Sequence, residues 1–209
     1  MDTEKKQVAV IDYDAGNIKS VVKALEYLGF KAFVTRKESE ILSASHVILP
    51  GVGSFADAME HLISYDLRDV IFKIREQGNP FLGICLGLQI LFEDSEESPG
   101  VKGLSILKGH VRRLKEANGL KVPNIGWNSC SLTNSGKLFS GIREEPFFYF
   151  VHSYYLSMDD ETKVRAVMDY GGISVHASIE DGNFFACQFH PEKSGDTGLL
   201  VLKNFLSQK

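Results

Sequence analysis

The segment Phe81–Gln89, FLGICLGLQ, places a cysteine between two glycines where an apolar run ends and a helical pattern begins. A Gly-x-Cys-x-Gly turn between a strand and a helix is typical of sites that display a nucleophile. Because the turn is tight, Gly83 and Gly87 are needed there: neither has a Cβ atom to obstruct packing of the helix on the strand. We therefore predict that Cys85 is a nucleophile at a helix N-terminus, where the helix dipole favours the reactive thiolate.

The chain around this segment alternates strand-like and helix-like stretches. Apolar runs predict strands, and apolar residues at helical spacing predict helices. The predicted strands in the first half are 7–11, 47–49 and 80–84, and the predicted helices are 17–28, 54–78 and 86–92. Strand, turn and helix, repeated in this order, predict an α/β fold with an open, mostly parallel sheet flanked by helices on both faces.

The second half predicts additional antiparallel strands, because short apolar runs are punctuated there by Gly, Asn and Asp. These strands are expected at 105–114, 147–155, 163–168, 174–179 and 183–189, followed by a closing helix at 196–206. No linker-like stretch interrupts the chain, so residues 1–209 are predicted to form a single domain.

Composition excludes several classes of function. The formal net charge is -4 over 209 residues, which argues against nucleic acid as a partner. The polar start at Met1–Lys6 does not resemble a signal peptide, and no stretch is apolar enough to span a membrane, so we expect a cytoplasmic protein. The 3 cysteines are widely spaced and odd in number, which argues against a disulfide framework and leaves thiol chemistry available.

A second cluster, Phe185–Glu192, supplies a candidate general base. His190 stands where an apolar strand ends, and Pro191 biases it toward extended backbone geometry. Glu192 can hydrogen-bond the imidazole and orient it, which would complete a triad with Cys85. Taken alone, His-Pro-Glu also fits a surface histidine beside a solvated glutamate. A zinc site through Cys187-x-x-His190 lacks further ligands, so we expect no metal and no cofactor.

A glycine-rich turn within Leu49–Phe55 is the third candidate element. Its glycines would let the backbone approach a ligand closely, so that N–H groups there and at Leu86 can form an oxyanion hole. A simple tight turn is the alternative interpretation, and a phosphate loop is disfavoured because the Gly-x-x-x-x-Gly-Lys pattern is absent. Gln89 lies one helical turn beyond Cys85 and can hydrogen-bond an amide substrate.

These clusters together resemble the class I, triad-type glutamine amidotransferases, which have a flavodoxin-like α/β fold. Within that family the chain is most similar to glutaminase subunits of imidazole glycerol phosphate synthase, an enzyme of histidine biosynthesis. The residues that carry the resemblance are 12–17 (DYDAGN), 49–53 (LPGVG), 80–89, 126–128 (GWN), 150–155 (FVHSYY) and 188–195 (QFHPEKSG).

The resemblance implies that glutamine is hydrolysed through a thioester on Cys85, giving glutamate and ammonia. It assigns the oxyanion donors to the backbone N–H groups of Val52 and Leu86. It implies that glutamine is held by Gln89 and by backbone near Gly51, Gly53, Ser153 and Tyr154. It further implies a heterodimer with a (β/α)8-barrel cyclase subunit, which receives the ammonia and which Asn17 and Lys193 would face.

The chain departs from the family pattern at two positions. Asn124 stands where His is expected, and Asp14 where Gly is expected. Neither belongs to the predicted triad. Three other interpretations stay open: a different amidotransferase of the same superfamily, a cysteine peptidase on a similar fold, and a non-enzymatic docking subunit. The last of these would tolerate loss of Cys85 or His190, and both residues are present.

Overall fold

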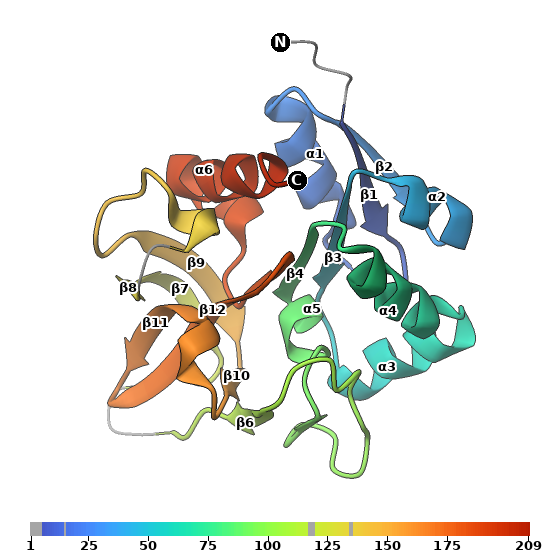
Figure 1. Ribbon diagram of the computed structural model, residues 1–209. Helices are drawn as coiled ribbons and strands as arrows, with labels where there is room; N and C mark the ends of the chain where they lie inside the picture. Colours follow the sequence, from blue (N-terminus) through green and yellow to red (C-terminus); the bar gives the residue numbers. More distant parts are fainter. Residues whose placement is uncertain (1–5, 15, 117–119, 134–135) are drawn as a thin grey trace.

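An eight-stranded sheet forms the centre of the molecule. The structure, a computed structural model, describes residues 6–14, 16–116, 120–133 and 136–209. Five strands run parallel in the order β2 (Lys31–Thr35), β1 (Gln7–Ile11), β3 (His46–Gly51), β4 (Phe81–Cys85) and β13 (Phe184–Cys187) (Figure 1). The sheet continues antiparallel through β12 (Ile173–Asp181), β11 (Val164–Tyr170) and β8 (Ser131–Leu132). The predicted mostly parallel sheet with added antiparallel strands is confirmed.

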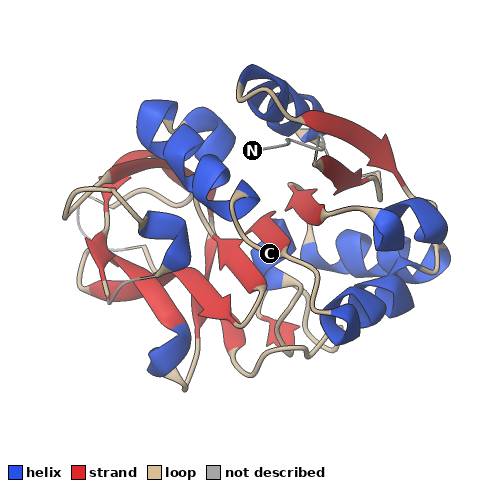
Figure 2. Ribbon diagram, turned by 45° about the horizontal axis from the view of Figure 1, so that its top comes forward, coloured by secondary structure: helices blue, strands red, loops and turns tan. Residues whose placement is uncertain are grey.

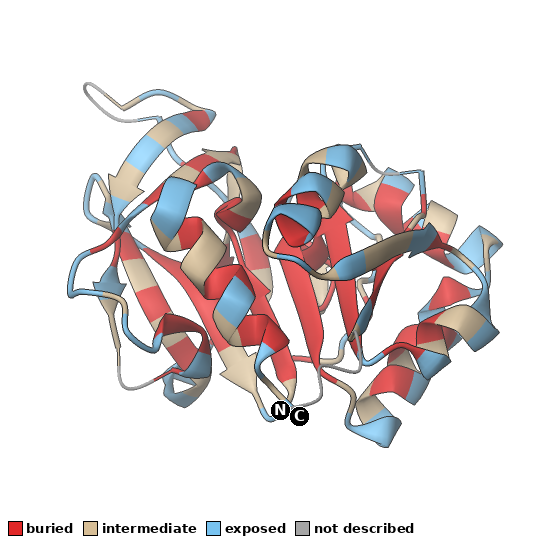
Figure 3. Ribbon diagram, turned by 90° about the horizontal axis from the view of Figure 1, so that it is seen from above, coloured by how far each residue is buried: buried red, intermediate tan, exposed pale blue. Residues whose placement is uncertain are grey.

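Helices cover both faces of this sheet (Figure 2). The helices α1 (Ile18–Tyr27) and α6 (Gly195–Leu206) pack on one face, and α2 (Glu38–Ser43), α3 (Phe55–Ser64) and α4 (Leu67–Gln77) pack on the other. β1 illustrates the reason: Val8 and Val10 join the core under α1 and α6, whereas Ala9 and Ile11 join the core on the opposite face. A strand buried on both faces is apolar throughout, and Figure 3 shows the central strands buried between the helices.

Two smaller sheets accompany the eight-stranded sheet. A three-stranded sheet contains β10 (Tyr154–Ser157), β6 (His110–Arg113) and β5 (Asp94–Ser95), and a hairpin-like pair contains β7 (Asn124–Ser129) and β9 (Phe147–His152). The described residues also form four short helical segments: α5 (Leu86–Gln89), η1 (Lys137–Phe139), η2 (Glu161–Lys163) and η3 (Pro191–Lys193). Ser153 is the single residue between β9 and β10, so the two small sheets are joined directly.

The structure corrects several predicted boundaries. The helix predicted at 54–78 is two helices, because Asp66 adopts a left-handed conformation with φ 58° between them. The strand predicted at 105–114 is limited to β6, and the strand at 147–155 is divided into β9 and β10. β2 and α2 were not predicted, although β2 contains the apolar run Ala32–Val34; β2 is an edge strand, and only Thr35 of its residues is buried. Within the described part of the chain, no helix has the length and apolar character needed to span a bilayer.

Gly87→Ala is expected to destabilise the protein by more than about 3 kcal/mol, because the new methyl group would overlap the carbonyl oxygen of Leu49 on β3. Chemical denaturation followed by circular dichroism measures this loss. Gly141→Ala is the control. Gly141 has φ 74° but open space around it, so alanine there should lower the free energy of unfolding only by the cost of the left-handed backbone, about 1 kcal/mol. Equal losses in the two variants would contradict the steric argument.

Candidate active site

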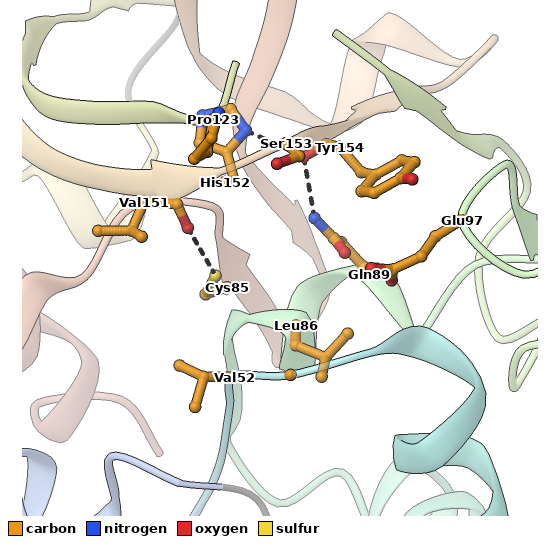
Figure 4. Close-up of a pocket in the computed structure, with 11 residues that line it drawn as sticks. Val52, Cys85, Leu86, Gln89, Glu97, Pro123, Val151, His152, Ser153 and Tyr154 are labelled. Carbon is orange, nitrogen blue, oxygen red and sulfur yellow. Dashed lines mark hydrogen bonds between the residues drawn. The ribbon is translucent and has the colours of Figure 1, made fainter. Parts of the chain in front are cut away.

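Cys85 occupies the turn between β4 and α5. Its backbone angles, φ 55° and ψ -107°, lie outside the regions that non-glycine residues ordinarily adopt, a strain of about 1–3 kcal/mol. Its side chain is 6% exposed and lines a cavity of about 230 Å³ (Figure 4). The helix after it ends at Gln89 rather than at the predicted Phe92, so its dipole is smaller than that of the longer helix expected from the sequence.

His190 is brought to Cys85 by the pairing of β13 with β4. The two strands run parallel with Cys187 beside Ile84, so the residues that follow each strand emerge at the same edge of the sheet. The backbone N–H of His190 donates to the carbonyl of Tyr149, 2.9 Å away on β9. The pairing of β13 with β4 and this bond to β9 therefore fix the backbone of His190, although more than 100 positions separate it from Cys85.

Glu192 orients the imidazole. Its Oε1 lies 2.9 Å from Nδ1 of His190, and the two side chains are 0% and 2% exposed. Asn17 Nδ2 donates to the same Oε1 at 2.5 Å. With Nδ1 directed to the carboxylate, the other ring nitrogen is left for Cys85. The structure thus brings together the three side chains of the predicted triad and adds Asn17 to them.

Electrostatics at this site favour a protonated imidazole. Burial by itself lowers the pKa of His190, but hydrogen bonding and charge from Cys85 and Glu192 outweigh burial and raise that pKa to about 10. An imidazolium beside the sulfur stabilises a thiolate, which is the nucleophilic form of cysteine. The arrangement can therefore supply both a nucleophile and a proton donor at neutral pH.

The cavity collects most of the residues predicted to bind substrate. β3 ends beside Cys85, which is paired with Gly51, and Gly53 follows with a left-handed φ of 111°. Gly51 itself does not line the cavity, because it is packed against the hydroxyl of Tyr13. The predicted site residues that line the cavity are Val52, Gly53, Cys85, Leu86, Gln89, Ser153 and Tyr154 (Figure 4). The lining also includes residues that were not predicted: Glu97, Pro123, Val151 and His152.

Two buried polar residues at this site were missed by the sequence analysis. Gln188 Nε2 lies 3.6 Å from Sγ of Cys85, and its Oε1 accepts a hydrogen bond from Gln89 at 3.0 Å. His152 lines the cavity and its Nδ1 lies 2.9 Å from the carbonyl oxygen of Tyr154. A signal for Gln188 was available, since residues two apart on an extended strand share a face and Gln188 stands two before His190.

The residues predicted to face a partner differ in their surroundings. Lys193 is exposed, whereas Asn17 is partly buried and bonded to Glu192.

The two residues that depart from the family pattern, Asn124 and Asp14, both have polar partners. Asn124 is buried and its Nδ2 lies 3.2 Å from His152 Nε2. Asp14, with φ 62°, forms an ion pair of 2.8 Å with Arg36, and Ala15 of the same motif lies outside the described residues.

No metal cluster is present in the described part of the chain: no group of three or more His, Cys, Asp or Glu side chains there is arranged to hold an ion. Cys85, Cys130 and Cys187 are all free and buried.

Similarity to known proteins identifies the family. The sequence model of the family "Glutamine amidotransferase class-I" matches residues 9–209. The chain belongs to this family. It is 50% identical to "Imidazole glycerol phosphate synthase subunit HisH" of Moorella thermoacetica, over 96% of this chain and 94% of the relative. It is 48% identical to the protein of the same name from Thermosynechococcus vestitus, over 96% of each chain.

Solved structures share the fold of this class-I amidotransferase. "Structure of PurLQS from Thermotoga maritima" matches with a TM-score of 0.75 and 22% identity, covering 97% of this chain and 98% of that one. "Crystal structure of glutamine amidotransferase" matches with a TM-score of 0.72 and 22% identity, covering 95% of this chain and 98% of that one. At these identities the likeness concerns the fold, and it agrees with the predicted α/β class.

In this amidotransferase, Glu192→Gln is expected to lower the pKa of His190 by about one unit or more, because the carboxylate that stabilises the imidazolium is lost. A folded-state pKa above the ordinary 6.5 means that His190 stabilises the fold fully below pH 6.5 and that this contribution is lost as the pH rises toward about 10. The stability advantage of the wild type over the variant should therefore shrink across that interval.

Proton NMR titration of the His190 ring measures the pKa, and denaturation at a series of pH values measures the stability difference. Glu161→Gln is the control, since Glu161 is an exposed carboxylate near His176 rather than near His190. A His190 titration that is identical in Glu192→Gln and wild type would contradict the assignment of the orienting carboxylate.

Proposed function

We propose that this chain is the glutaminase subunit of imidazole glycerol phosphate synthase, which hydrolyses glutamine and passes the ammonia to the cyclase subunit of that enzyme. The observation that carries the proposal is the buried arrangement of Cys85, His190 and Glu192 beside a cavity. It occurs in a class-I glutamine amidotransferase whose relatives at 46–50% identity are named as this subunit.

The proposed reaction begins with attack by the Cys85 thiolate on the side-chain amide carbon of glutamine. A C–S bond forms, and an electron pair moves onto the amide oxygen. The backbone N–H groups of Val52 and Leu86, whose residues both line the cavity, are the proposed donors to this oxyanion. Their contribution is selective for the intermediate because the negative charge develops only after attack.

Collapse of the oxyanion breaks the C–N bond. The His190 imidazolium gives its proton to the departing nitrogen, so that ammonia leaves and a thioester remains on Cys85. His190, now neutral, accepts a proton from a water molecule as that water attacks the thioester. Breakage of the C–S bond then releases glutamate and restores the thiolate and the imidazolium. Glu192 keeps the ring in one orientation throughout these steps.

Groups suited to the rest of the substrate surround the cavity. Gln89 and the backbone near Gly51, Gly53, Ser153 and Tyr154 are proposed to hold the glutamine. The carboxylate of Glu97 also lines the cavity and suits the α-ammonium group of an amino acid. Its Oε2 accepts from the backbone N–H of Phe55 at 2.8 Å, which fixes the position of the carboxylate.

A partner is proposed from the surface next to the triad. Ile125, Trp127 and Phe147 on β7 and β9 are 61%, 54% and 58% exposed, although large apolar side chains are usually covered. The side chain of Trp127 approaches Gly195, two residues after the exposed Lys193. We propose that a (β/α)8-barrel cyclase subunit covers this surface, and that ring formation in histidine biosynthesis belongs to that partner.

Cys85→Ala is expected to reduce the kcat for glutamine hydrolysis by at least about 10³-fold, because no other group can form the thioester. Glutamate release measured with a coupled dehydrogenase assay checks this. Cys130→Ala is the matched control: that thiol is buried, its pKa is raised to about 12 by burial, and it does not line the cavity. Near-normal turnover in a folded Cys85→Ala protein would refute the mechanism.

Glutamine hydrolysis by the isolated chain is expected to be slow and to rise at least about tenfold when the cyclase subunit, together with its nucleotide ligand, is added. The reason is that ammonia released without an acceptor is lost to solvent. Glutamate release with and without the partner is the measurement. Rapid turnover that does not depend on the partner would leave the triad chemistry in place and contradict the proposed coupling.

A further inference from the structure

Gln188 is a fully buried amide beside Cys85 that has no part in the reaction steps above. Cys187 pairs with Ile84 in the register between β13 and β4, so Gln188, which directly follows β13, lies beside Cys85, the last residue of β4. The backbone N–H of Gln188 donates to the carbonyl of Ala177 on β12 at 2.8 Å. This bond to β12 fixes the backbone of Gln188 directly beyond the end of β13.

Hydrogen bonds determine which end of this amide faces the sulfur. The carbonyl oxygen of Tyr154 can only accept, so the group of Gln89 that lies 3.0 Å from it is the NH₂ group. The same Nε2 lies 3.0 Å from Gln188, which must therefore present its Oε1 to Gln89. Gln188 then directs its own Nε2, a donor, at Sγ of Cys85, 3.6 Å away.

The Tyr154 carbonyl is itself held in place from the other side. His152 Nδ1 lies 2.9 Å from it, and His152 Nε2 lies 3.2 Å from Asn124 Nδ2. Burial lowers the pKa of His152 to about 4, so the ring is neutral at neutral pH and carries its proton on Nδ1, where the carbonyl accepts it. The donor and the acceptor are therefore assigned in every hydrogen bond that links Asn124, through His152, Tyr154 and Gln89, to Gln188.

We propose that Gln188 is a positioning residue that donates a hydrogen bond from Nε2 to the Cys85 thiolate and holds the sulfur for attack. This inference rests on the proposed function of Cys85 as the nucleophile. The thiol form has a different partner, because its S–H can donate to the carbonyl of Val151, 3.8 Å away. Gln188 therefore stabilises the charged form and Val151 the neutral one, and hydrogen bonds to charged groups are the stronger kind.

Other ionisable groups lie around the sulfur, and a substitution at Gln188 leaves all of them unchanged. Cys85 and Glu192 both raise the pKa of His190, and Glu192 orients its ring. The charge of Cys85 raises the pKa of Tyr13 and of Cys187, after the larger effect of burial on each. The remaining ionisable groups that line the cavity are Glu97, His152 and Tyr154.

The test replaces Gln188 with methionine, which has a similar shape and no donor. The pH dependence of Cys85 alkylation by iodoacetamide is followed by mass spectrometry of the Cys85 peptide; Cys130 and Cys187 are 1% and 0% exposed and should stay unmodified. We expect Gln188→Met to raise the pH midpoint of alkylation by about one unit. The kcat should fall about tenfold, with KM changed less than about twofold.

Ser178→Ala is the matched control. Ser178 is fully buried on β12 beside Cys187, and its hydroxyl donates to the carbonyl of Ala186 at 2.9 Å without contacting the sulfur. Its alkylation midpoint should equal that of the wild type. An unchanged midpoint in folded Gln188→Met protein would overturn the inference, as would an equal shift in both variants.

A second measurement needs no substitution at Gln188. In the wild-type protein the side-chain amide resonance of Gln188 should move with pH at the alkylation midpoint, and this movement should be absent in Cys85→Ala. An amide resonance that is insensitive to the state of Cys85 would also overturn the inference. Because alkylation requires no glutamine, absence of glutamine turnover would count against the proposed function alone and leave the result for Gln188 standing.

Discussion

The parallel pairing of β13 with β4 is the constraint on which the site depends. It places two strand ends at one edge of the sheet, so that Cys85 on one and His190 beyond the other meet without a flexible connection. Residues on central strands are buried on both faces and move little, which makes them precise supports for reacting groups. Cys85 is the last residue of β4, and Gln188 and His190 follow within three residues of the end of β13.

The site also requires close packing at the turn that holds Cys85. Gly83 and Gly87 lie where any side chain would overlap backbone atoms, so α5 can rest directly on β3 and β4. This contact forces Cys85 into a strained conformation, which the surrounding sheet sustains. In this conformation Cys85 lines the cavity.

Buried charge at the site is balanced locally. A buried carboxylate or imidazolium is costly unless each is paired and hydrogen-bonded. The Oε1 atom of Glu192 is paired with both His190 and Asn17, whereas its buried Oε2 has no hydrogen-bond partner among the described residues. Hydrogen bonding and charge from Glu192 and Cys85 act together on His190. The departure at Asn124 follows the same rule, because its amide fills the hydrogen-bonding needs of a buried neutral histidine, His152.

The sequence alone determined the parts of the protein that depend on neighbouring residues. The glycines around Cys85, the His-Pro-Glu run and the alternation of apolar strands with helices are local patterns, and each predicted its element. The tertiary structure decided the rest. It split the helix predicted at 54–78, shortened α5 and joined Gln89 to Tyr154 and Gln188, residues 65 and 99 positions away. Such contacts depend on the register of strands that are distant in the chain, and no local pattern specifies that register.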